Sequence, residues 1–200
     1  MAIFYKISRS FLQGAFSLLY KHTATMPAEG IYPHAALIAA NHTSFLDPPL
    51  IAASLQEEVF FLANSYLFTN PFFRTLITSL NAHPVSKNAS DIATLRTICA
   101  LLKDGKKVVI FPEGTRSHDN TIAPFKRGLG LLAEKAHCPI IPAYIYGASD
   151  AWPRGQRLPR LFGAKTACHF GSPIFLSQEG RQGQELLAKQ THEAILELRI

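Results

Sequence analysis

The chain has few cysteines and no long apolar run. Its three cysteines, among 200 residues, are odd in number and widely spaced. They therefore predict neither a disulfide framework nor a cysteine metal site, and they favour a reducing compartment. Because no stretch of about 18 uninterrupted apolar residues is present, no membrane-spanning helix is predicted. The N-terminus also lacks a compact apolar core followed by a small-residue cleavage site, so we expect no signal peptide.

Charge is also scarce, and most of it is positive. Charged residues make up 17% of the chain and hydrophobic residues 48%. This balance indicates either a protein that contacts a membrane or one with a large buried sheet. The formal net charge of +6 suits a negatively charged partner such as lipid headgroups, an acidic carrier protein or nucleic acid. Nucleic acid is the least favoured, because zinc-finger spacing, aromatic ribonucleoprotein motifs and long Lys/Arg runs are missing.

Residues 4–22 have the pattern of an amphipathic helix. Its apolar positions recur at three- and four-residue steps and are Phe4, Ile7, Phe11, Ala15, Leu18 and Leu19. Aromatic bulk flanked by positive charge is typical of an interfacial membrane anchor. The alternative is a helix packed on the core of its own domain, and amphipathicity does not separate the two. On the first interpretation the chain consists of an N-terminal membrane-associating helix, residues 1–25, and one domain, residues 26–200.

Strand-like and helix-like segments alternate through the rest of the chain. The sequence predicts strands at residues 36–40, 59–63, 83–86, 107–111, 139–146 and 166–171. It predicts helices at residues 48–55, 71–80, 91–103, 128–137 and 184–198. Strands separated by helices of this length predict an α/β fold, a mixed sheet flanked by helices. The segment 149–163 is predicted to be a loop, and its three arginines are a candidate docking site for an acidic carrier protein or anionic lipid, or simply a solvated surface.

A histidine and an aspartate follow the strand predicted at 36–40. Five positions apart on one helix, His42 and Asp47 would point about 140° apart, so they meet only if residues 43–46 form a turn. The Pro48-Pro49 pair favours such a break, and Asp47 is predicted to be the N-cap of the next helix. In that geometry Asp47 fixes the tautomer of His42, whose other ring nitrogen accepts a proton from an alcohol. The alternative is a capping aspartate beside an ordinary loop histidine.

A second group of polar residues, Glu113 to Ser117, follows the strand predicted at 107–111. Gly114 permits backbone angles at which main-chain N–H groups face an anion, and Thr115 belongs to the same turn. Arg116 offers a planar fork that matches a phosphate monoester. Glu113 is expected to bind a substrate hydroxyl or to hold Arg116. The alternative is a surface turn with a solvated charge pair.

Two lysines are further candidates for a phosphate. Lys126 lies with Arg127 at the start of a predicted helix, where positive side chains oppose the helix dipole and so indicate a nearby anion. Lys87 follows the short strand predicted at 83–86. For each of them the alternative is an ordinary exposed lysine.

Taken together, these motifs resemble the bacterial 1-acylglycerol-3-phosphate acyltransferases, the PlsC-like branch of the lysophospholipid acyltransferases. The family motif N-H-x4-D is matched by Asn41, His42 and Asp47, and the motif [IV]-x-F-P-E-G-T-R-S by residues 109–117. An apolar pair before proline is matched by residues 140–142. The chain departs from the family in one motif, where Lys87 stands for the usual arginine. Lysine keeps the charge but loses the bidentate fork, which bears on headgroup preference more than on the chemistry.

The resemblance implies a glycerol-3-phosphate acyltransferase-like fold, peripheral or monotopic on the cytoplasmic face of the cell membrane. It implies transfer of a fatty acyl group from acyl-CoA or acyl carrier protein to the sn-2 hydroxyl of lysophosphatidic acid, giving phosphatidic acid. His42 would be the base, Asp47 its orienting partner, and the turn at Glu113 to Arg116 the acceptor site. No metal or cofactor is implied beyond the acyl donor. The alternatives are another acceptor, such as glycerol 3-phosphate or another lysophospholipid, and a non-catalytic lipid-binding membrane protein.

Overall fold

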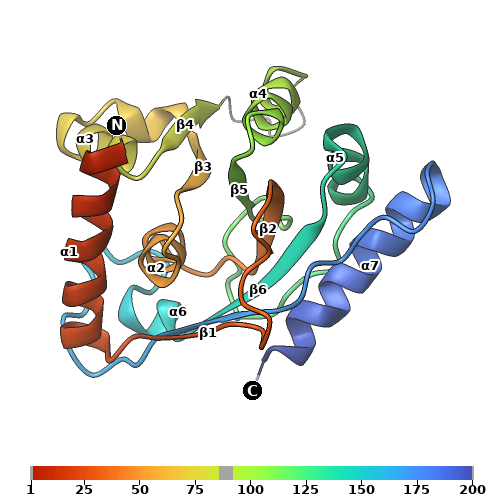
Figure 1. Ribbon diagram of the computed structural model, residues 1–200. Coiled ribbons are helices and arrows are strands. Elements are labelled where there is room, and N and C mark those ends of the chain that lie inside the picture. The colour runs from red at the N-terminus through yellow and green to blue at the C-terminus, as the bar shows by residue number, and fades with distance from the viewer. Residues whose placement is uncertain (1, 86–91, 200) are drawn as a thin grey trace.

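A single seven-stranded sheet forms the centre of the computed structural model, which describes residues 2–85 and 92–199 (Figure 1). Its strands are β1 (Thr23–Thr25), β2 (Ala36–Ala40), β3 (Val59–Asn64), β4 (Ala82–Val85), β5 (Lys107–Ile110), β6 (Ile140–Tyr146) and β7 (Ala167–Phe170). The strand order is β1-β7-β6-β2-β5-β3-β4. Neighbouring strands are parallel except β6 and β7, which are antiparallel. The predicted mixed sheet is therefore confirmed.

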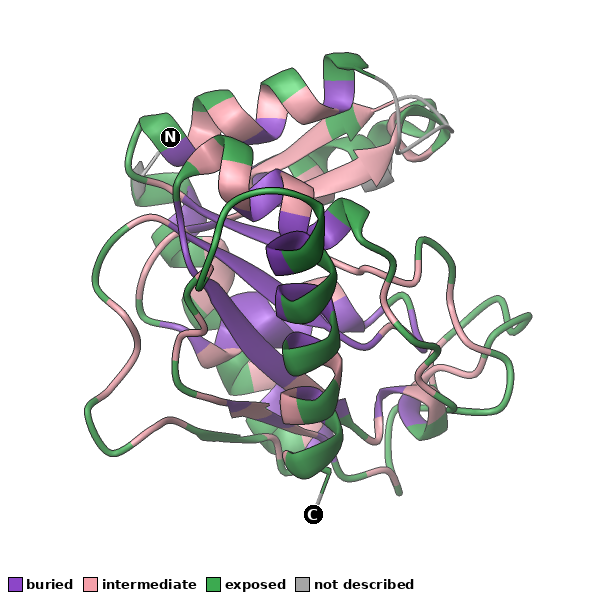
Figure 2. Ribbon diagram, turned by 90° about the vertical axis from the view of Figure 1, so that its right-hand side faces the viewer, coloured by how far each residue is buried: buried purple, intermediate pink, exposed green. Residues whose placement is uncertain are grey.

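Helices cover both faces of the sheet. They are α1 (Ala2–Tyr20), α2 (Asp47–Ser54), α3 (Pro71–Ser79), α4 (Ile92–Lys103), α5 (Gly128–Ala136), α6 (Ala148–Ala151) and α7 (Arg181–Glu197), with the 3₁₀ helix η1 (Ser65–Phe68). One apolar cluster joins α1 and α2 to the sheet, and a second joins α4, α5 and α7 to its other face. In Figure 2 the buried strands lie beneath α7, whose outer face is exposed.

The central strand β2 is completely buried, and this determines where the site lies. Its sequence, ALIAA, consists of small or apolar residues, as expected for a parallel strand covered on both faces. It pairs with β5 on one side and β6 on the other. Asn41 and His42 follow β2 directly. They therefore lie at the carboxyl ends of the parallel strands, in the middle of the sheet.

Helix α1 buries one face and exposes an apolar stripe on the other. Tyr5, Phe16 and Tyr20 are buried in the core beside α2. The exposed stripe consists of Ile3, Phe4, Ile7, Phe11 and Leu18. The periodicity in the sequence thus identified mainly the outward face, while a separate face packs on the domain. Among residues 2–85 and 92–199, every helix is too short or too polar to span a membrane.

Three short elements were not predicted from the sequence, namely β1, η1 and α6. Each has only three or four residues, too few for a period of 2 or 3.6 to show. The other elements agree with the predicted ranges, with shifts of up to three residues at their ends. Ser86 and Asp91, which were predicted to end a strand and begin a helix, lie outside the described residues.

His22, between α1 and β1, connects three segments of the chain. Its Nε2 lies 2.8 Å from Ser54 Oγ on α2, and its Nδ1 lies 2.9 Å from Thr166 Oγ1 before β7. Because the Ser54 hydroxyl donates to Leu50 O, at 2.7 Å, its oxygen accepts from His22. Neutral His22 therefore carries its proton on Nε2. Burial lowers the pKa of His22 to about 4, and a backbone hydrogen bond with Thr166 opposes this effect.

We expect His22 to make the protein less stable in acid. Its pKa is about 4 in the folded chain, against 6.5 for an unperturbed histidine. As the pH falls from 6.5 towards 4, the unfolded chain binds a proton that the folded chain does not, so stability present above pH 6.5 is lost. Between pH 7 and 5 this amounts to about 2 kcal/mol of unfolding free energy.

Urea denaturation of the parent and of His22→Gln at these two pH values measures this contribution. The parent should lose about 2 kcal/mol more than the variant on acidification. The exposed His137 offers the control, because His137→Gln should keep the pH dependence of the parent. An equal loss in the parent and in His22→Gln would show that His22 does not carry the effect.

Candidate active site

The structure brings His42 and Asp47 together through a turn. His42 Nδ1 lies 2.7 Å from Asp47 Oδ2. The same oxygen accepts the backbone N–H groups of Thr43, at 2.7 Å, and Ser44, at 2.8 Å. The Asp47 side chain is fully buried, while 20% of the His42 side chain is exposed. The pair is therefore closed on its carboxylate side and open on its imidazole side.

Asp47 is not the N-cap of α2, contrary to the prediction. It is the first residue of the helix, and Leu46 occupies the N-cap position without a side-chain capping bond. The carboxylate instead turns back to the main chain of the preceding turn. Its second oxygen, Oδ1, is buried and has no hydrogen-bond partner within the part of the chain that the structure describes. The hydrogen bonds that these residues make with the carboxylate converge on Oδ2.

The main chain of His42 is fixed by the turn that follows β5. His42 N–H donates to Glu113 Oε1, at 2.9 Å, and His42 O accepts from Ser117 N–H, at 2.7 Å. The imidazole ring stacks on Phe111, with ring centroids 4.1 Å apart and planes 19° apart. The second polar group of the sequence therefore holds the histidine from one side.

Asn41 fixes the same segment from the other side, where β6 runs. Its side-chain Nδ2 donates to Ile145 O at 3.0 Å, and its Oδ1 accepts from Ile145 N at 2.7 Å. The Asn41 side chain is buried. This pair of side-chain hydrogen bonds ties the residue after β2 to the backbone of β6 and so aligns the histidine that follows.

Residues 111–114 form a tight turn, and Gly114 has the unusual backbone angles that the sequence predicts for it. Gly114 adopts a φ of +70°, in the left-handed region, and its N–H donates to Phe111 O at 3.0 Å. Burial raises the pKa of the Glu113 carboxyl, while hydrogen bonds from the backbone of His42 and Ala123 oppose the shift. Of the roles expected for Glu113, holding Arg116 is not observed, because these two residues form no ion pair and Glu113 binds main-chain amides instead.

Arg116 lies over the aromatic ring of Phe45, a residue of the turn between His42 and Asp47. Its Cζ is 3.7 Å from the centroid of Phe45, and Phe45 in turn contacts Trp152, at 5.6 Å between ring centroids. Burial and the neighbouring positive charge of Arg154 lower the pKa of Arg116, while Asp47 opposes them. Among residues 2–85 and 92–199, no carboxylate pairs with Arg116. Its guanidinium fork is thus available to an anion.

The remaining candidate residues contribute less to this arrangement. Thr115 and Lys126 are exposed. Arg127, beside Lys126, donates to Gln184 on α7, at 3.1 Å, and so is directed away from the dyad. Lys87 lies outside the described residues. The described part of the chain contains no group of three or more metal-ligating side chains suited to an ion.

Phe45, Trp152 and Arg154 line the site but were not identified as site residues from the sequence. Phe45 lies inside the H-x4-D turn, and Trp152 is the only tryptophan of the chain, so both carried a weak signal. Arg154 belongs to the segment 149–163, which the sequence marks only as a candidate docking loop. Its Nη1 donates to the backbone oxygen of Arg116.

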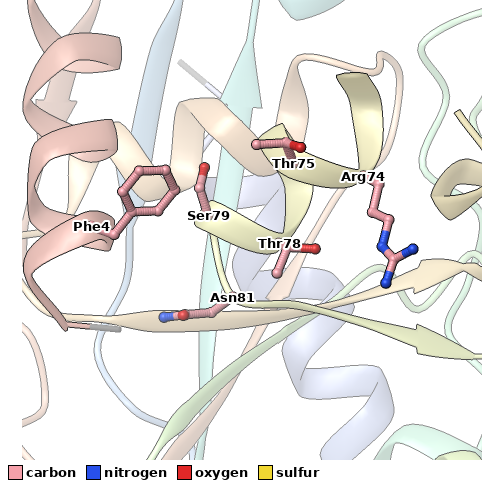
Figure 3. Close-up of a pocket in the computed structure, with 6 residues that line it drawn as sticks. All are labelled: Phe4, Arg74, Thr75, Thr78, Ser79 and Asn81. Carbon is pink, nitrogen blue, oxygen red and sulfur yellow. The ribbon is translucent and has the colours of Figure 1, made fainter. Parts of the chain in front are cut away.

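Two cavities help to locate the chemistry. One of about 300 Å³ lies between α1 and α3 (Figure 3), lined by Phe4, Arg74, Thr75, Thr78, Ser79 and Asn81. Asn81 precedes β4, whereas His42 follows β2. Because these strands are parallel, the cavity lies at their amino ends and the His42–Asp47 pair at their carboxyl ends. A smaller cavity of about 170 Å³ is lined by both neighbours of His42 in the sequence and therefore adjoins the dyad.

Comparison with known proteins assigns this arrangement to a family. The family model described as "Acyltransferase" matches residues 19–146. The chain belongs to the acyltransferase family. It is similar to the chloroplastic 1-acyl-sn-glycerol-3-phosphate acyltransferase BAT2 of Brassica napus, with 31% identity over 119 residues, 58% of this chain and 34% of the relative. It is 30% identical over 115 residues to the 1-acyl-sn-glycerol-3-phosphate acyltransferase of Bacillus subtilis (strain 168), covering 57% of each chain.

A solved structure is similar to this chain over nearly its whole length. The crystal structure of the 1-acyl-sn-glycerophosphate (LPA) acyltransferase PlsC from Thermotoga maritima matches with a TM-score of 0.77 and 26% identity. The match covers 98% of this chain and 79% of that one. The chain thus spans between about a third and about four fifths of the length of these three relatives. The expected fold, an α/β sheet flanked by helices, is confirmed.

We expect neutral His42 to carry its proton on Nδ1. An ionised carboxylate only accepts hydrogen bonds, and Asp47 Oδ2 already accepts two from the main chain, so Nδ1 is the donor of the third. Nitrogen-15 NMR of histidine-labelled protein should show a protonated Nδ1 and a free Nε2 for this residue. Asp47→Asn should remove that preference, with His137 as an unaffected reference. A protonated Nε2 in the parent would contradict the geometry.

Proposed function

We propose that the protein transfers a fatty acyl group from a thioester to the sn-2 hydroxyl of lysophosphatidic acid, giving phosphatidic acid. The observation that carries this proposal is the His42–Asp47 pair, with Nδ1 bound to a buried carboxylate at 2.7 Å and the imidazole partly open to solvent. A protein that only bound lipid would have no use for such a base. The names of the relatives, 1-acyl-sn-glycerol-3-phosphate acyltransferases, support the choice of acceptor.

In the proposed mechanism His42 is a general base. Its Nε2 takes the proton of the acceptor hydroxyl as the hydroxyl oxygen attacks the carbonyl carbon of the thioester. Asp47 stabilises the imidazolium that forms and keeps its orientation. The tetrahedral intermediate then collapses, the carbon–sulfur bond breaks, and the imidazolium returns its proton to the leaving thiolate. The ester is formed without a covalent enzyme intermediate, and His42 ends the cycle neutral.

Arg116 is the residue best placed to bind the phosphate of the acceptor. Its guanidinium has no carboxylate partner among residues 2–85 and 92–199, is half-buried and lies over the ring of Phe45. Partial burial strengthens a charge-assisted bond to phosphate. Gly114 and Thr115 belong to the same turn and offer main-chain and hydroxyl groups nearby. Glu113 acts indirectly, because it fixes the main chain of His42.

We further propose that the enzyme works at the cytoplasmic face of the cell membrane. The exposed stripe of α1 places Phe4, Ile7 and Phe11 on its surface, and an amphipathic helix of this kind lies in the headgroup region of a bilayer. Acyl-CoA or acyl carrier protein would deliver the acyl group from the water phase. Lys87 and Lys126 remain candidates for additional contacts with the headgroup, and Lys87 in place of an arginine keeps glycerol 3-phosphate as the second candidate acceptor.

Product analysis in phospholipid vesicles tests this function. Lysophosphatidic acid or glycerol 3-phosphate is supplied with acyl-CoA or acyl-loaded carrier protein, and the lipids are identified by mass spectrometry. The parent should make phosphatidic acid from lysophosphatidic acid, and His42→Ala should be slower by about 10²- to 10⁴-fold, the usual contribution of general-base catalysis. The exposed His137→Ala is the matched control. Preference for glycerol 3-phosphate, release of free fatty acid alone, or undiminished turnover by His42→Ala would each contradict the proposal.

A further inference from the structure

The segment between α6 and β7 exposes an unusual combination of side chains. Three large apolar residues of this basic loop, residues 153–165, are exposed: Leu158 by 76%, Leu161 by 56% and Phe162 by 70%. Its positive residues, also exposed, are Arg154, Arg157, Arg160 and Lys165. No aspartate or glutamate occurs within the loop. Single exposed apolar residues are common on proteins, but three within five positions mark an interaction site.

Both ends of the basic loop are attached to the body of the protein. Arg160 N–H donates to Ala151 O at 2.7 Å, and Trp152 Nε1 donates to Gln156 O at 2.9 Å. Thr166, just beyond the loop, donates its N–H to Tyr20 O, the last residue of α1, at 3.1 Å. In Figure 1 the light-blue chain between α6 and β7 turns around this C-terminal end of α1. The loop therefore starts and ends at fixed points beside the helix that carries the exposed apolar stripe.

Arg154 in the basic loop and Trp152, the residue just before the loop, also contact the active site. Arg154 donates to the backbone oxygen of Arg116, and Trp152 packs against Phe45. The carbonyl oxygen of Trp152 accepts the hydroxyl of Ser44, at 2.9 Å, inside the turn that joins His42 to Asp47. A partner that binds this loop would therefore lie next to the residues that surround His42 and Asp47.

We propose that the basic loop is a second membrane-binding element, which inserts Leu158, Leu161 and Phe162 among the headgroups of anionic phospholipids. Apolar side chains interspersed with cations are the chemistry of interfacial lipid binding, in which burial and attraction to negative headgroups add. An acidic protein partner would satisfy the arginines but leaves three exposed apolar side chains unexplained. The inference rests on the proposed membrane association of α1 for its orientation. It goes further in assigning selectivity for anionic lipid to the loop.

Vesicle sedimentation separates the contribution of the loop from that of α1. The tests use Arg157→Gln/Arg160→Gln and Leu158→Ser/Leu161→Ser/Phe162→Ser, with vesicles of phosphatidylcholine alone or with phosphatidylglycerol. The double arginine variant should bind the anionic vesicles about 30-fold more weakly, which is about 2 kcal/mol at about 1 kcal/mol per cation. The serine variant should bind both kinds of vesicle more weakly than the parent. The matched charge control is Lys135→Gln/Lys189→Gln, on α5 and α7, which should bind like the parent.

Phe4→Ser/Phe11→Ser, on the exposed face of α1, tests the other element. It should weaken binding to both kinds of vesicle by a similar factor and keep the preference for anionic lipid. If this variant binds like the parent, the proposed role of α1 fails, while the effect of the loop arginines remains measurable. Acyltransferase activity is measured in a separate assay. A protein without that activity could therefore still show the predicted vesicle binding by the loop.

Hydrogen exchange of the parent tests the loop without any substitution. Amides of residues 155–163 should exchange more slowly with phosphatidylglycerol vesicles than with phosphatidylcholine vesicles, and those of α7 should not change. Thermal unfolding of each variant shows whether it is folded. The proposal is overturned if the arginine variant binds anionic vesicles as tightly as the Lys135/Lys189 control, or if exchange in the loop is unaffected. It is also overturned if the loop variants lose binding to acyl carrier protein instead of to lipid.

Discussion

The active site depends on one buried oxygen atom. Asp47 Oδ2 accepts hydrogen bonds from His42 Nδ1 and from the backbone N–H groups of Thr43 and Ser44. A buried carboxylate is costly without hydrogen-bond donors, and the turn between the two residues supplies two of them from its main chain. The same bonds set the imidazole tautomer and the point at which α2 begins. The Asp47 carboxylate therefore determines both the fold of this turn and the protonation of the proposed base.

The sheet supplies the second constraint, because it fixes the main chain from which His42 projects. Asn41 hydrogen-bonds to Ile145 on β6, and on the opposite side Glu113 and Ser117 bind the N–H and C=O of His42. The polar turn after β5 thus has two different tasks. Its glutamate and serine hold the histidine, whereas Arg116 lies over an aromatic ring and pairs with no carboxylate in the described part of the chain.

Much of this arrangement could be predicted from local sequence. Strand β2 was predicted with its observed ends, because a short apolar run bounded by polar residues is a strong local signal. The meeting of His42 and Asp47 was predicted on the condition that residues 43–46 form a turn, which the prolines after them favour. The partner of Glu113 could not be predicted in this way, since it lies 71 positions away in the sequence. The contacts of Asn41 with Ile145 and of Ser44 with Trp152 span more than 100 positions, and no local pattern encodes them. For α1, periodicity found an apolar face but not whether that face was covered.

The measurement that tests this account most directly is a double-mutant cycle in phosphatidic acid formation, using His42→Ala, Asp47→Asn and the two together. If Asp47 acts only through His42, its loss should cost a large factor in kcat in the parent and almost nothing once His42 is absent. The double variant should then be about as slow as His42→Ala alone. Losses that multiply, or an Asp47→Asn variant that is folded and as fast as the parent, would contradict a dyad in which the buried carboxylate serves the base.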